Sequence, residues 1–302
     1  MTLEAEGVLA LELVPIQGTE LPPFDAGSHV DLHLPHATRS YSLAGNPAER
    51  RRYLLAVARG TTSGGASAYV HERLRPGDLV AIGAPRNNFP LDEAAEHSVL
   101  IAGGIGITPL LSMIARLERN GAAWSLHYSC RSRAGAPFLN RLAPFAPQVT
   151  LSLRDETPNR LDLARIVAEA PARAHFYACG PNTMLDSFRG ATAHLASEQV
   201  HLEWFAPVEE KAVEGGFLVK LCRSGLQLTV QPGQTVLDAV LEAGVAAPFS
   251  CLEGVCGSCE VGVVDGQPDH RDVILSEAER AAGKTMMICV SGARTPLLAL
   301  DL

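Results

Sequence analysis

Four cysteines in the last third of the chain restrict its fold more than any other feature. Three of them stand close together at Cys251, Cys256 and Cys259, and the fourth follows at Cys289. The spacing C-x4-C-x2-C with a distant fourth cysteine is typical of a plant-type 2Fe–2S cluster, in which four thiolates hold two bridged irons. The chain must therefore bring one tight loop and one remote segment to the same point.

Glycines inside the cysteine loop suit this geometry. Gly254 and Gly257 can adopt backbone angles that are closed to other residues, and they let amide N–H groups approach the sulfurs. A zinc site would more naturally show two separated C-x2-C pairs, whereas only Cys256 and Cys259 form such a pair. A redox disulfide would need a thioredoxin-like turn, which the surrounding sequence does not suggest. Zinc and disulfide chemistry remain the alternatives to the cluster.

Length and composition place this loop in a folded chain of several domains. The chain has 302 residues, more than one hydrophobic core usually holds. Hydrophobic residues make up 47% and charged residues 19%, which excludes wholesale disorder, and the net charge of −8 argues against nucleic-acid binding. We find no leader-like segment at the first residues, and glycines break the apolar stretch 99–115, so we expect no membrane span and a cytoplasmic protein.

The first 95 or so residues predict a small antiparallel β-barrel, with short strands at 8–13, 30–34 and 53–57 separated by Pro, Gly and Asn clusters. One strand carries Arg39, Ser40, Tyr41 and Ser42. A guanidinium beside an aromatic ring could bind a phosphate and a flat ring, although such a segment is also common in ordinary edge strands.

Small residues precede a helical pattern in the same module, at Gly64, Gly65, Ala66 and Ser67. Free N–H groups at the start of a helix can bind an anion. The alternative is a flexible turn in which Ser67 caps the helix.

From about residue 97 the pattern changes to alternating strands and helices, which predicts a mostly parallel sheet with ligand loops at the carboxyl ends of its strands. The apolar run 98–102 is followed by Gly103, Gly104 and Gly106 and then by a helical pattern. This order can bring a pyrophosphate to a helix N-terminus, although the glycines do not spell G-x-G-x-x-G. We expect Thr108 to cap that helix and Pro109 to lie in its first turn.

Further strands at 124–128, 149–153 and 175–178 complete this sheet, and the last runs into a turn at Cys179, Gly180 and Pro181. Two arginines, Arg131 and Arg133, follow the strand that ends near residue 128. They could contact the ribose or the 2′-phosphate of a nucleotide, or they could be solvated loop residues.

The last part of the chain begins after a linker near residues 207–216. We expect a hairpin from 217–221 and 226–230, a helix over 235–243, a strand at 260–264, and a strand that reaches Cys289. Ser276 and Glu279 predict a capping box at a short helix. From 217 to 302 the sequence carries six basic and ten acidic residues, which would either steer a basic partner or simply keep the surface soluble.

Taken together, these motifs resemble the phthalate dioxygenase reductase family over essentially the whole chain. The resemblance implies an FMN-binding, ferredoxin-reductase-like antiparallel β-barrel at 1–95 and an NAD-binding α/β domain with a parallel sheet at 96–207. A linker at 208–216 and a β-grasp, plant-type 2Fe–2S ferredoxin domain at 217–302 would follow. It also implies NADH as electron donor, FMN because of this domain order, and a terminal Rieske non-haem iron oxygenase as acceptor of a monomeric reductase.

The same resemblance suggests residue roles. Arg39 would contact the FMN phosphate, Tyr41 would pack on the flavin ring, and Ser42 would approach its hydride-accepting nitrogen. The cofactor-binding residues implied for the flavin are Arg39, Ser40, Tyr41, Ser42, Gly65, Ala66, Ser67 and Phe205, with Trp204 as the alternative aromatic. Those for the nicotinamide nucleotide are Gly103, Gly104, Gly106, Thr108, Pro109, Arg131, Cys179, Gly180 and Pro181.

In this scheme Ser42, Thr108 and Cys179 surround the site of hydride transfer, and the irons are held by Cys251, Cys256, Cys259 and Cys289. Ala66 departs from the family pattern, since many relatives have glycine there. Two other functions stay open. One is an electron carrier whose flavin-like half is a degenerate scaffold, and the other is an FAD-dependent enzyme that prefers NADPH.

Overall fold

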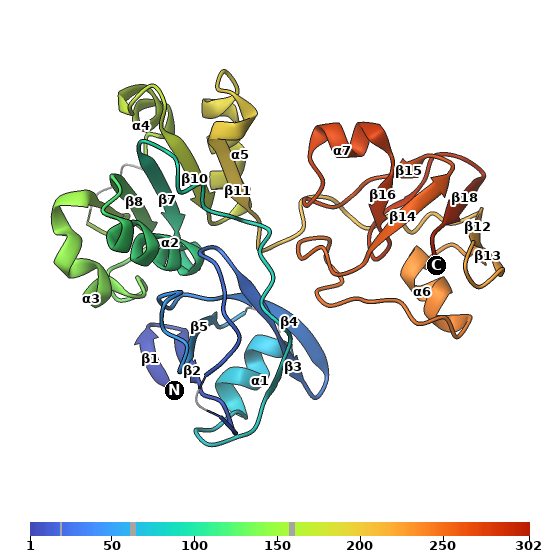
Figure 1. Ribbon diagram of the computed structural model, residues 1–302, viewed down its shortest axis with the longest axis horizontal. Coiled ribbons are helices and arrows are strands. Elements are labelled where there is room, and N and C mark those ends of the chain that lie inside the picture. Colours follow the sequence, from blue (N-terminus) through green and yellow to red (C-terminus); the bar gives the residue numbers. More distant parts are fainter. Residues whose placement is uncertain (19, 61–64, 157–160) are drawn as a thin grey trace. The chain divides into compact units, whose positions relative to one another are not determined.

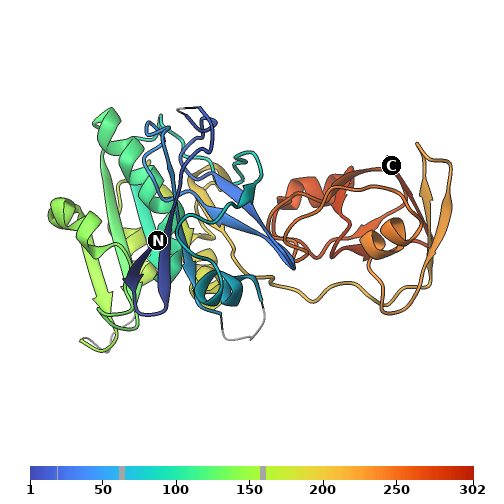
Figure 2. The same ribbon diagram turned by 90° about the horizontal axis from the view of Figure 1, so that it is seen from below.

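The computed structural model describes residues 1–18, 20–60, 65–156 and 161–302 (Figures 1 and 2). The chain packs into two units, Met1–Phe205 and Ala206–Leu302. Within the described residues no helix is long and apolar enough to cross a membrane. Gly64, which was predicted to open an anion site, lies outside the described residues. The predicted division of the first unit near residue 95 and the exact linker bounds stay predictions.

The first part of unit Met1–Phe205 consists of two antiparallel sheets of three strands and the short helix α1 (Ala66–Glu72). One sheet has the order β1 (Thr2–Ala5), β2 (Val8–Leu13), β5 (Tyr53–Ala58). The other has the order β4 (Ala37–Ser42), β3 (His29–Leu34), β6 (Ala81–Ile82). Their inner faces and α1 enclose a core that includes Leu11, Val30, Leu55 and Val70. The predicted antiparallel β module is confirmed.

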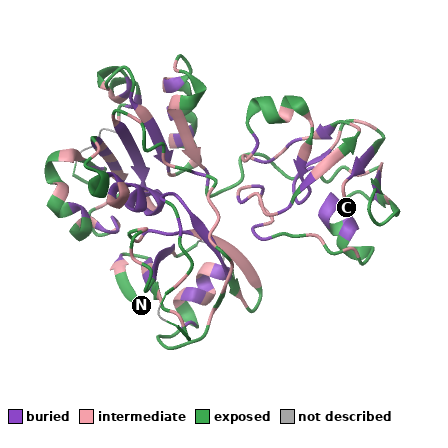
Figure 3. Cartoon of the chain, viewed as in Figure 1, coloured by how far each residue is buried: buried purple, intermediate pink, exposed green. Residues whose placement is uncertain are grey.

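The second part of this unit is a parallel sheet in the order β11 (Val200–Glu203), β10 (His175–Cys179), β7 (Ser98–Gly103), β8 (Trp124–Cys130), β9 (Val149–Leu153). It confirms the predicted α/β arrangement. All six residues of β7 are buried, as Figure 3 shows for the central strands. The strand order reverses between β7 and β10, and ligands of open α/β sheets bind beyond the carboxyl ends of the strands at such a point.

Helices connect these strands: η1 (Gly104–Gly106), α2 (Ile107–Asn120), α3 (Leu139–Leu142), η2 (Ala143–Gln148), α4 (Leu163–Glu169), α5 (Asn182–Thr192) and η3 (Ser197–Gln199). The largest, α2, has nine buried residues. One core runs through both parts of the unit, because Ala5 and Val8 from the β-sheets pack in the same cluster as Leu100 and Leu110. The antiparallel strands and the parallel sheet therefore hold each other in place.

The start of α2 differs from the prediction. Gly106 is the N-cap residue and Ile107 begins the helix, so Thr108 is not the cap. The Thr108 hydroxyl instead donates a hydrogen bond to the Ile105 carbonyl oxygen at 2.9 Å. The reason is that η1 already turns the chain over Gly104–Gly106, which moves the helix start toward the glycines. Pro109 lies in the first turn, as predicted.

Unit Ala206–Leu302 has a five-stranded mixed sheet in the order β13 (Gln227–Val230), β12 (Phe217–Leu221), β18 (Leu297–Leu300), β14 (Glu260–Asp265), β16 (Thr285–Met287). A small sheet pairs β15 (Pro268–Asp269) with β17 (Gly292–Ala293). The helix α6 (Val236–Glu242) buries Val236, Leu237 and Val240 in the core that the large sheet provides. The predicted hairpin and the helix beginning after Thr235 are confirmed.

Capping fixes both helices of this unit. Thr235 and Asp238 form a capping box at α6, and Ser276 and Glu279 form the predicted one at α7 (Glu277–Ala282). Each box satisfies two backbone N–H groups that would otherwise lack partners. These boxes fix where each helix begins, and the cysteine loop follows α6.

Candidate functional site

The four cysteines of the predicted cluster lie together in unit Ala206–Leu302 as two pairs. All four are buried, with at most 3% of each residue exposed. The thiol of Cys251 is hydrogen-bonded to that of Cys256, and the thiol of Cys259 to that of Cys289. No three His, Cys, Asp or Glu side chains of the described residues are close enough to hold a single metal ion. Two pairs of thiols match a centre of two irons with two thiolates each.

The pairing shifts the acidity of the thiols in opposite directions. The hydrogen bond from Cys251 lowers the pKa of Cys256 to about 5, and the thiol of Cys259 likewise lowers the pKa of Cys289. The pKa values of Cys251 and Cys259 are raised, first by these same contacts and then by burial. One member of each pair is thus ready to be a thiolate, the form that binds iron.

Backbone amides of the loop point at the sulfurs. The amide of Glu253 donates to the Cys251 sulfur at 3.3 Å, and the backbone of Gly254 is hydrogen-bonded to Cys289. Gly254 has φ +71°, and a Cβ there would lie 2.8 Å from the Val290 side chain. Only glycine gives both this backbone angle and this close approach. The loop therefore has the features expected of a 2Fe–2S cradle.

The fourth cysteine is placed differently from the prediction. The strand β16 ends at Met287, and Cys289 lies in the turn that follows. The prediction of a strand reaching Cys289 is therefore wrong by two residues. Turning the chain at this point lets the Cys289 sulfur face the amide of Gly254, which a continuing strand, paired to its neighbour, would not allow.

The candidate hydride-transfer site lies in unit Met1–Phe205, where Ser42 ends β4, Cys179 ends β10 and Glu203 ends β11. The Cys179 thiol donates to Glu203 Oε2 at 3.9 Å, and the Ser42 hydroxyl donates to the same carboxylate. Cys179 and Glu203 are neighbours in the register of the parallel strands. The structure thus brings together two of the predicted catalytic residues.

Glu203 was missed by the sequence analysis. Burial raises the pKa of its carboxyl group to about 8, although the hydrogen bonds from Cys179 and Ser42 work against this shift. Burial also raises the pKa of the Cys179 thiol well above its usual value, with Glu203 adding to the effect. The only sequence signal was a single acidic residue at the end of a strand, directly before the aromatic pair Trp204 and Phe205. A perturbed carboxyl group in a polar cluster is a common mark of a functional site.

The two loops predicted to bind the nucleotide, which follow β7 and β10, contact each other through their backbones. A Cβ on Gly106 would lie 2.2 Å from the Cys179 carbonyl oxygen, and one on Gly103 would lie 2.6 Å from the Pro181 side chain. A Cβ on Gly180 would lie 3.0 Å from the Gly103 backbone. These glycines are needed because η1 and the turn after β10 touch, which brings both loops to the switch point of the sheet. Gly104 adds a positive φ of +54°.

The predicted flavin strand has two distinct faces. Side chains alternate along a strand, so Arg39 and Tyr41 share one face of β4. The Arg39 guanidinium also donates to the Thr38 carbonyl oxygen at 3.0 Å. Burial raises the pKa of Tyr41 to about 12, with the nearby charge of Arg39 acting in the opposite direction. A cation and a protonated phenol thus stand side by side.

The other face of β4 is anchored to its neighbour. The Ser40 hydroxyl donates to Asp31 Oδ1 at 2.7 Å, and Asp31 accepts two hydrogen bonds from Arg86 at 2.7 and 2.9 Å. The hydrogen bond from Ser40 links β4 to β3, and the bidentate pair with Arg86 holds the Asp31 carboxylate in place, so Ser40 has a structural partner within the protein. Its predicted contact with the flavin stays a prediction.

The residues predicted to bind a phosphate lie at the start of α1. Gly65 is the N-cap of α1, so Ser67 does not cap that helix; its hydroxyl accepts from the Gly60 amide at 3.1 Å. Ala66 is the first residue of the helix and is buried. Their predicted role at a phosphate stays untested.

Solvent exposure and ion pairing distinguish the two candidate aromatic residues at the flavin and the two candidate arginines at the nucleotide. Phe205 is 37% exposed, whereas Trp204 is 7% exposed, so Phe205 is the more accessible aromatic. Arg133 is paired with Glu156 through hydrogen bonds of 2.9 and 3.1 Å. Arg131 is exposed and, among the described residues, makes no ion pair. Arg131 is thus the better placed of the two arginines for an added anion.

Known proteins match this chain both in its last part and over its whole length. The family described as 2Fe-2S iron-sulfur cluster binding domain matches residues 219–294, which include all four cysteines. The match confirms the predicted cluster over the zinc and disulfide alternatives. It also agrees with the two thiol pairs of the structure.

Relatives match along nearly their full length. Phenoxybenzoate dioxygenase subunit beta of Ectopseudomonas oleovorans is 54% identical over 299 residues, covering 99% of this chain and 94% of that protein. Vanillate O-demethylase oxidoreductase of Pseudomonas sp. is 40% identical over 314 residues, covering 100% and 98%. The solved structure of phthalate dioxygenase reductase, described as modular for electron transfer from pyridine nucleotides to [2Fe–2S], matches with TM-score 0.74 and 36% identity, covering 99% and 94%. The predicted fold class is confirmed by this likeness.

Proposed function

Since this chain belongs to the phthalate dioxygenase reductase family and is therefore a flavin- and NADH-dependent 2Fe–2S oxidoreductase, we propose that it is the reductase component of a Rieske-type oxygenase system. FMN, when bound, accepts a hydride from NADH and releases electrons singly to the cluster, a division of two electrons that no amino acid side chain can perform. We propose further that the reductase is monomeric and cytoplasmic, and that its acceptor is a terminal oxygenase.

The observation that carries this proposal is the contact of three side chains, Ser42, Cys179 and Glu203, at the carboxyl ends of three strands. At neutral pH the Glu203 carboxyl group, with its pKa raised to about 8, is mostly protonated. A neutral carboxyl and a neutral Cys179 thiol do not repel the negative charge that moves with a hydride. Ser42 can turn its hydroxyl toward a ring nitrogen, so the three groups orient two flat rings against each other.

The nucleotide would lie over the glycine contact between η1 and the turn after β10. Backbone without side chains lets a nicotinamide ring approach closely, and the N-terminus of α2 favours the negative charge of a pyrophosphate. Thr108 and Pro109 occupy the first turn there, with the Thr108 hydroxyl already bonded to Ile105. Thr108 would therefore shape the pocket wall rather than donate a proton.

The flavin would lie along β4. The Arg39 guanidinium is suited to the single phosphate of FMN, and the half-buried ring of Tyr41 offers a stacking surface beside it. Phe205, the accessible aromatic after β11, could cover the other side of the ring system. The domain order, with the cluster unit last, supports FMN rather than FAD.

Unit Ala206–Leu302 would carry electrons away. Burial of all four cysteines keeps water from the irons, and the loop amides stabilise the negative sulfurs. Plant-type clusters have potentials of roughly −400 mV, below those of Rieske centres, so transfer to a Rieske oxygenase is downhill.

Purification tests the proposal directly. The protein should contain FMN and two irons per chain, with FMN told from FAD by mass, and it should reduce cytochrome c faster with NADH than with NADPH. A flavin-free protein after reconstitution would favour the electron-carrier alternative. FAD with an NADPH preference would favour the other one.

Identification of the acceptor needs a second experiment. The reductase should form a complex with, and reduce, an oxygenase that contains a Rieske centre, measured by the bleaching of that centre after NADH is added. Reduction of a non-Rieske acceptor alone would overturn the assignment of the partner. It would leave the flavin and cluster chemistry in place.

A further inference from the structure

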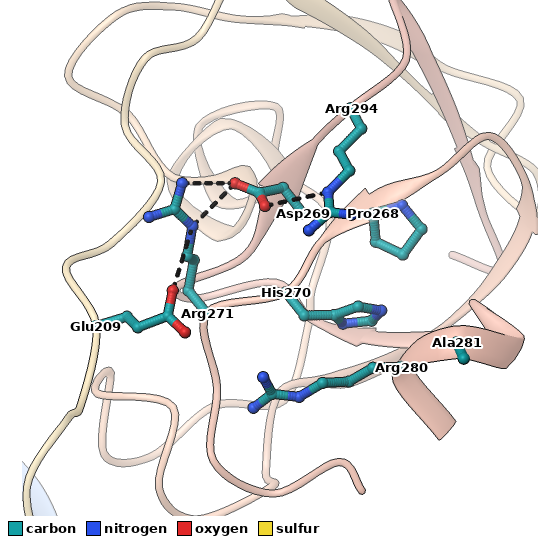
Figure 4. Close-up of a pocket in the computed structure, with 8 residues that line it drawn as sticks. All are labelled: Glu209, Pro268, Asp269, His270, Arg271, Arg280, Ala281 and Arg294. Carbon is teal, nitrogen blue, oxygen red and sulfur yellow. Dashed lines mark hydrogen bonds and ion pairs between the residues drawn. The ribbon is translucent and has the colours of Figure 1, made fainter. Parts of the chain in front are cut away.

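Glu4, in β1, makes a contact that the sites described above do not explain. Its carboxylate oxygen Oε1 accepts a hydrogen bond of 3.1 Å from the backbone N–H of Phe138, which is 134 residues away in the chain. In the pocket of unit Ala206–Leu302 shown in Figure 4, by contrast, acidic side chains pair with arginines, as Asp269 does with Arg271. A hydrogen bond between a carboxylate and a backbone N–H is roughly twice as strong as one between neutral groups. Glu4 therefore holds a distant segment of backbone in place.

Phe138 has a strained backbone that needs such support. Its φ of +65° lies in the left-handed region, which a bulky residue rarely adopts. A strained residue keeps its conformation only where the surrounding structure holds it there. The Phe138 side chain is fully buried, and it belongs to the same core cluster as Ala5, the residue after Glu4. The strand β1 thus supports Phe138 through a hydrogen bond and through a shared core.

The loop 131–138, between β8 and α3, ends at Phe138 and is held by the N-terminal segment at a second point. The backbone N–H of Glu6 donates to the Ala134 carbonyl oxygen at 2.8 Å. Ala136, also in this loop, is buried in the same core cluster. The loop begins beyond the carboxyl end of β8, at the edge of the sheet where ligands of such folds bind. The N-terminal segment therefore fixes a loop beside the proposed nucleotide site.

Tyr128, in β8, connects this loop to the glycine loop η1. Its buried hydroxyl lies 3.2 Å from both the Pro137 and the Gly104 carbonyl oxygens and donates to them. Burial raises the pKa of the Tyr128 hydroxyl, and the nearby Cys130 and Glu4 add to this rise, so the group keeps its proton and remains a donor. A continuous line of contacts thus runs from β1 to the backbone of η1.

We propose that Glu4 is a positioning residue for the nucleotide, which it affects through Phe138, Tyr128 and the glycine loop. This inference rests on the proposed function, because that function places NADH at η1. Without the Glu4 carboxylate the strained loop 131–138 relaxes, and the Tyr128 hydroxyl loses the geometry in which it meets both carbonyl oxygens. The residues of the proposed hydride site belong to other strands. Glu4 therefore acts on the binding of the nucleotide and not on the transfer of hydride.

Rapid mixing of NADH with the complete protein, with flavin and cluster bound, separates binding from hydride transfer. The rate of flavin bleaching at increasing NADH concentrations gives a half-saturating concentration and a limiting rate. We expect Glu4→Ala to raise the half-saturating concentration about tenfold, as the loss of one charge-assisted hydrogen bond implies. The limiting rate should stay within about twofold, because only binding is weakened.

Two matched variants serve as controls. Glu4→Gln keeps an oxygen that can accept from the Phe138 amide, so its half-saturating concentration should stay within about threefold of that of the parent protein. Glu6→Ala removes an exposed carboxylate close by but keeps the backbone N–H that donates to Ala134, so it should not change binding. Unchanged binding in Glu4→Ala, or equal effects of Glu4→Ala and Glu6→Ala, would overturn the proposal.

A double substitution tests the route of the effect. Tyr128→Phe removes only the hydroxyl and should by itself raise the half-saturating concentration about tenfold. Adding Glu4→Ala should then raise it by less than about threefold, because two residues in one line of contacts are not additive. A combined increase of about a hundredfold would overturn the proposal, since Glu4 would then act by another route.

The comparison of Glu4→Ala with Glu4→Gln decides the proposal even if Tyr128→Phe does not fold. Failure of the proposed function would look different. It would show in the parent protein, whose flavin would not be bleached by NADH, whereas failure of the role of Glu4 would show only in the variants.

Discussion

The cysteine loop and the hydride-transfer site are built in opposite ways. Three of the four cysteines proposed as cluster ligands, Cys251, Cys256 and Cys259, come from one loop, whose shape depends on local backbone angles such as that of Gly254. The proposed hydride site takes Ser42, Cys179 and Glu203 from the ends of three separate strands. The loop therefore depends on its own residues, whereas the hydride site depends on the register of two sheets. Damage to one site should leave the other working.

The largest expected effect is loss of the cluster by Cys256→Ser. Iron content should fall to near zero and cytochrome c reduction by more than about 100-fold, because even residues that only support metal ligands cost about 10- to 100-fold. The iron assay and the electron paramagnetic resonance signal of the reduced protein measure this. Cys222→Ser, at the exposed cysteine of the same unit, is the control and should keep both. An unchanged iron content in Cys256→Ser would show that the ligand set is wrong.

A backbone clash should damage the hydride site alone. In Gly106→Ala the new Cβ would lie 2.2 Å from the Cys179 carbonyl oxygen, and backbone atoms cannot move aside as a side chain can. We expect a loss of about 1–3 kcal/mol in the free energy of unfolding and about 100-fold in the rate of flavin reduction by NADH. Gly190→Ala, in α5 with open space around its Cβ, is the control. Equal rates for the two variants would contradict the loop contact.

The acidity of Glu203 gives a smaller effect that depends on pH. Its pKa in the folded protein is about 8, above the ordinary carboxyl value of 4.5, so the folded state holds a proton that the unfolded state has released between these values. The stability of the flavin-free protein should therefore fall as pH rises from 4.5 to 8. Glu203→Gln cannot ionise and should not show this loss. At high pH we expect the free energies of unfolding of the two proteins to differ by about a few kcal/mol, as a pKa shift of this size implies.

Urea unfolding of both flavin-free proteins at pH 5, 7 and 9 checks this prediction. The two stability curves should meet at low pH and separate at high pH. Parallel curves would mean that water reaches the Glu203 carboxyl group and that the hydride site is not closed.

The smallest effect is expected at Arg131. Its side chain is exposed, and NADH has no 2′-phosphate for it to bind, so Arg131→Ala should change the rate with NADH less than about twofold. The ratio of NADH to NADPH activity measures this. Arg133→Ala, at the arginine paired with Glu156, is the control. An NADPH preference that disappears in Arg131→Ala would contradict NADH as the donor.

These contrasts explain how much the sequence could predict. The sequence predicted the cysteine loop, the hydrophobic strands and the capping box at Ser276, because each of these depends on residues that are close together in the chain. The role of Glu203 depends on the pairing of β10 with β11, which places it beside Cys179, and no local pattern contains that register. The start of α2 was missed because Gly104–Gly106 turns before the helix, and the position of Cys289 because β16 stops two residues early.

The central claim is that hydride enters in unit Met1–Phe205 and that electrons leave from the cysteine loop of unit Ala206–Leu302. Rapid mixing of NADH with the complete protein and with Cys256→Ser, followed through the absorbance of the flavin, tests it most directly. We predict that the flavin bleaches at the same rate in both proteins and that the later phase, the reduction of the cluster, is missing from the variant. A folded, flavin-containing Cys256→Ser protein that does not bleach would contradict the account.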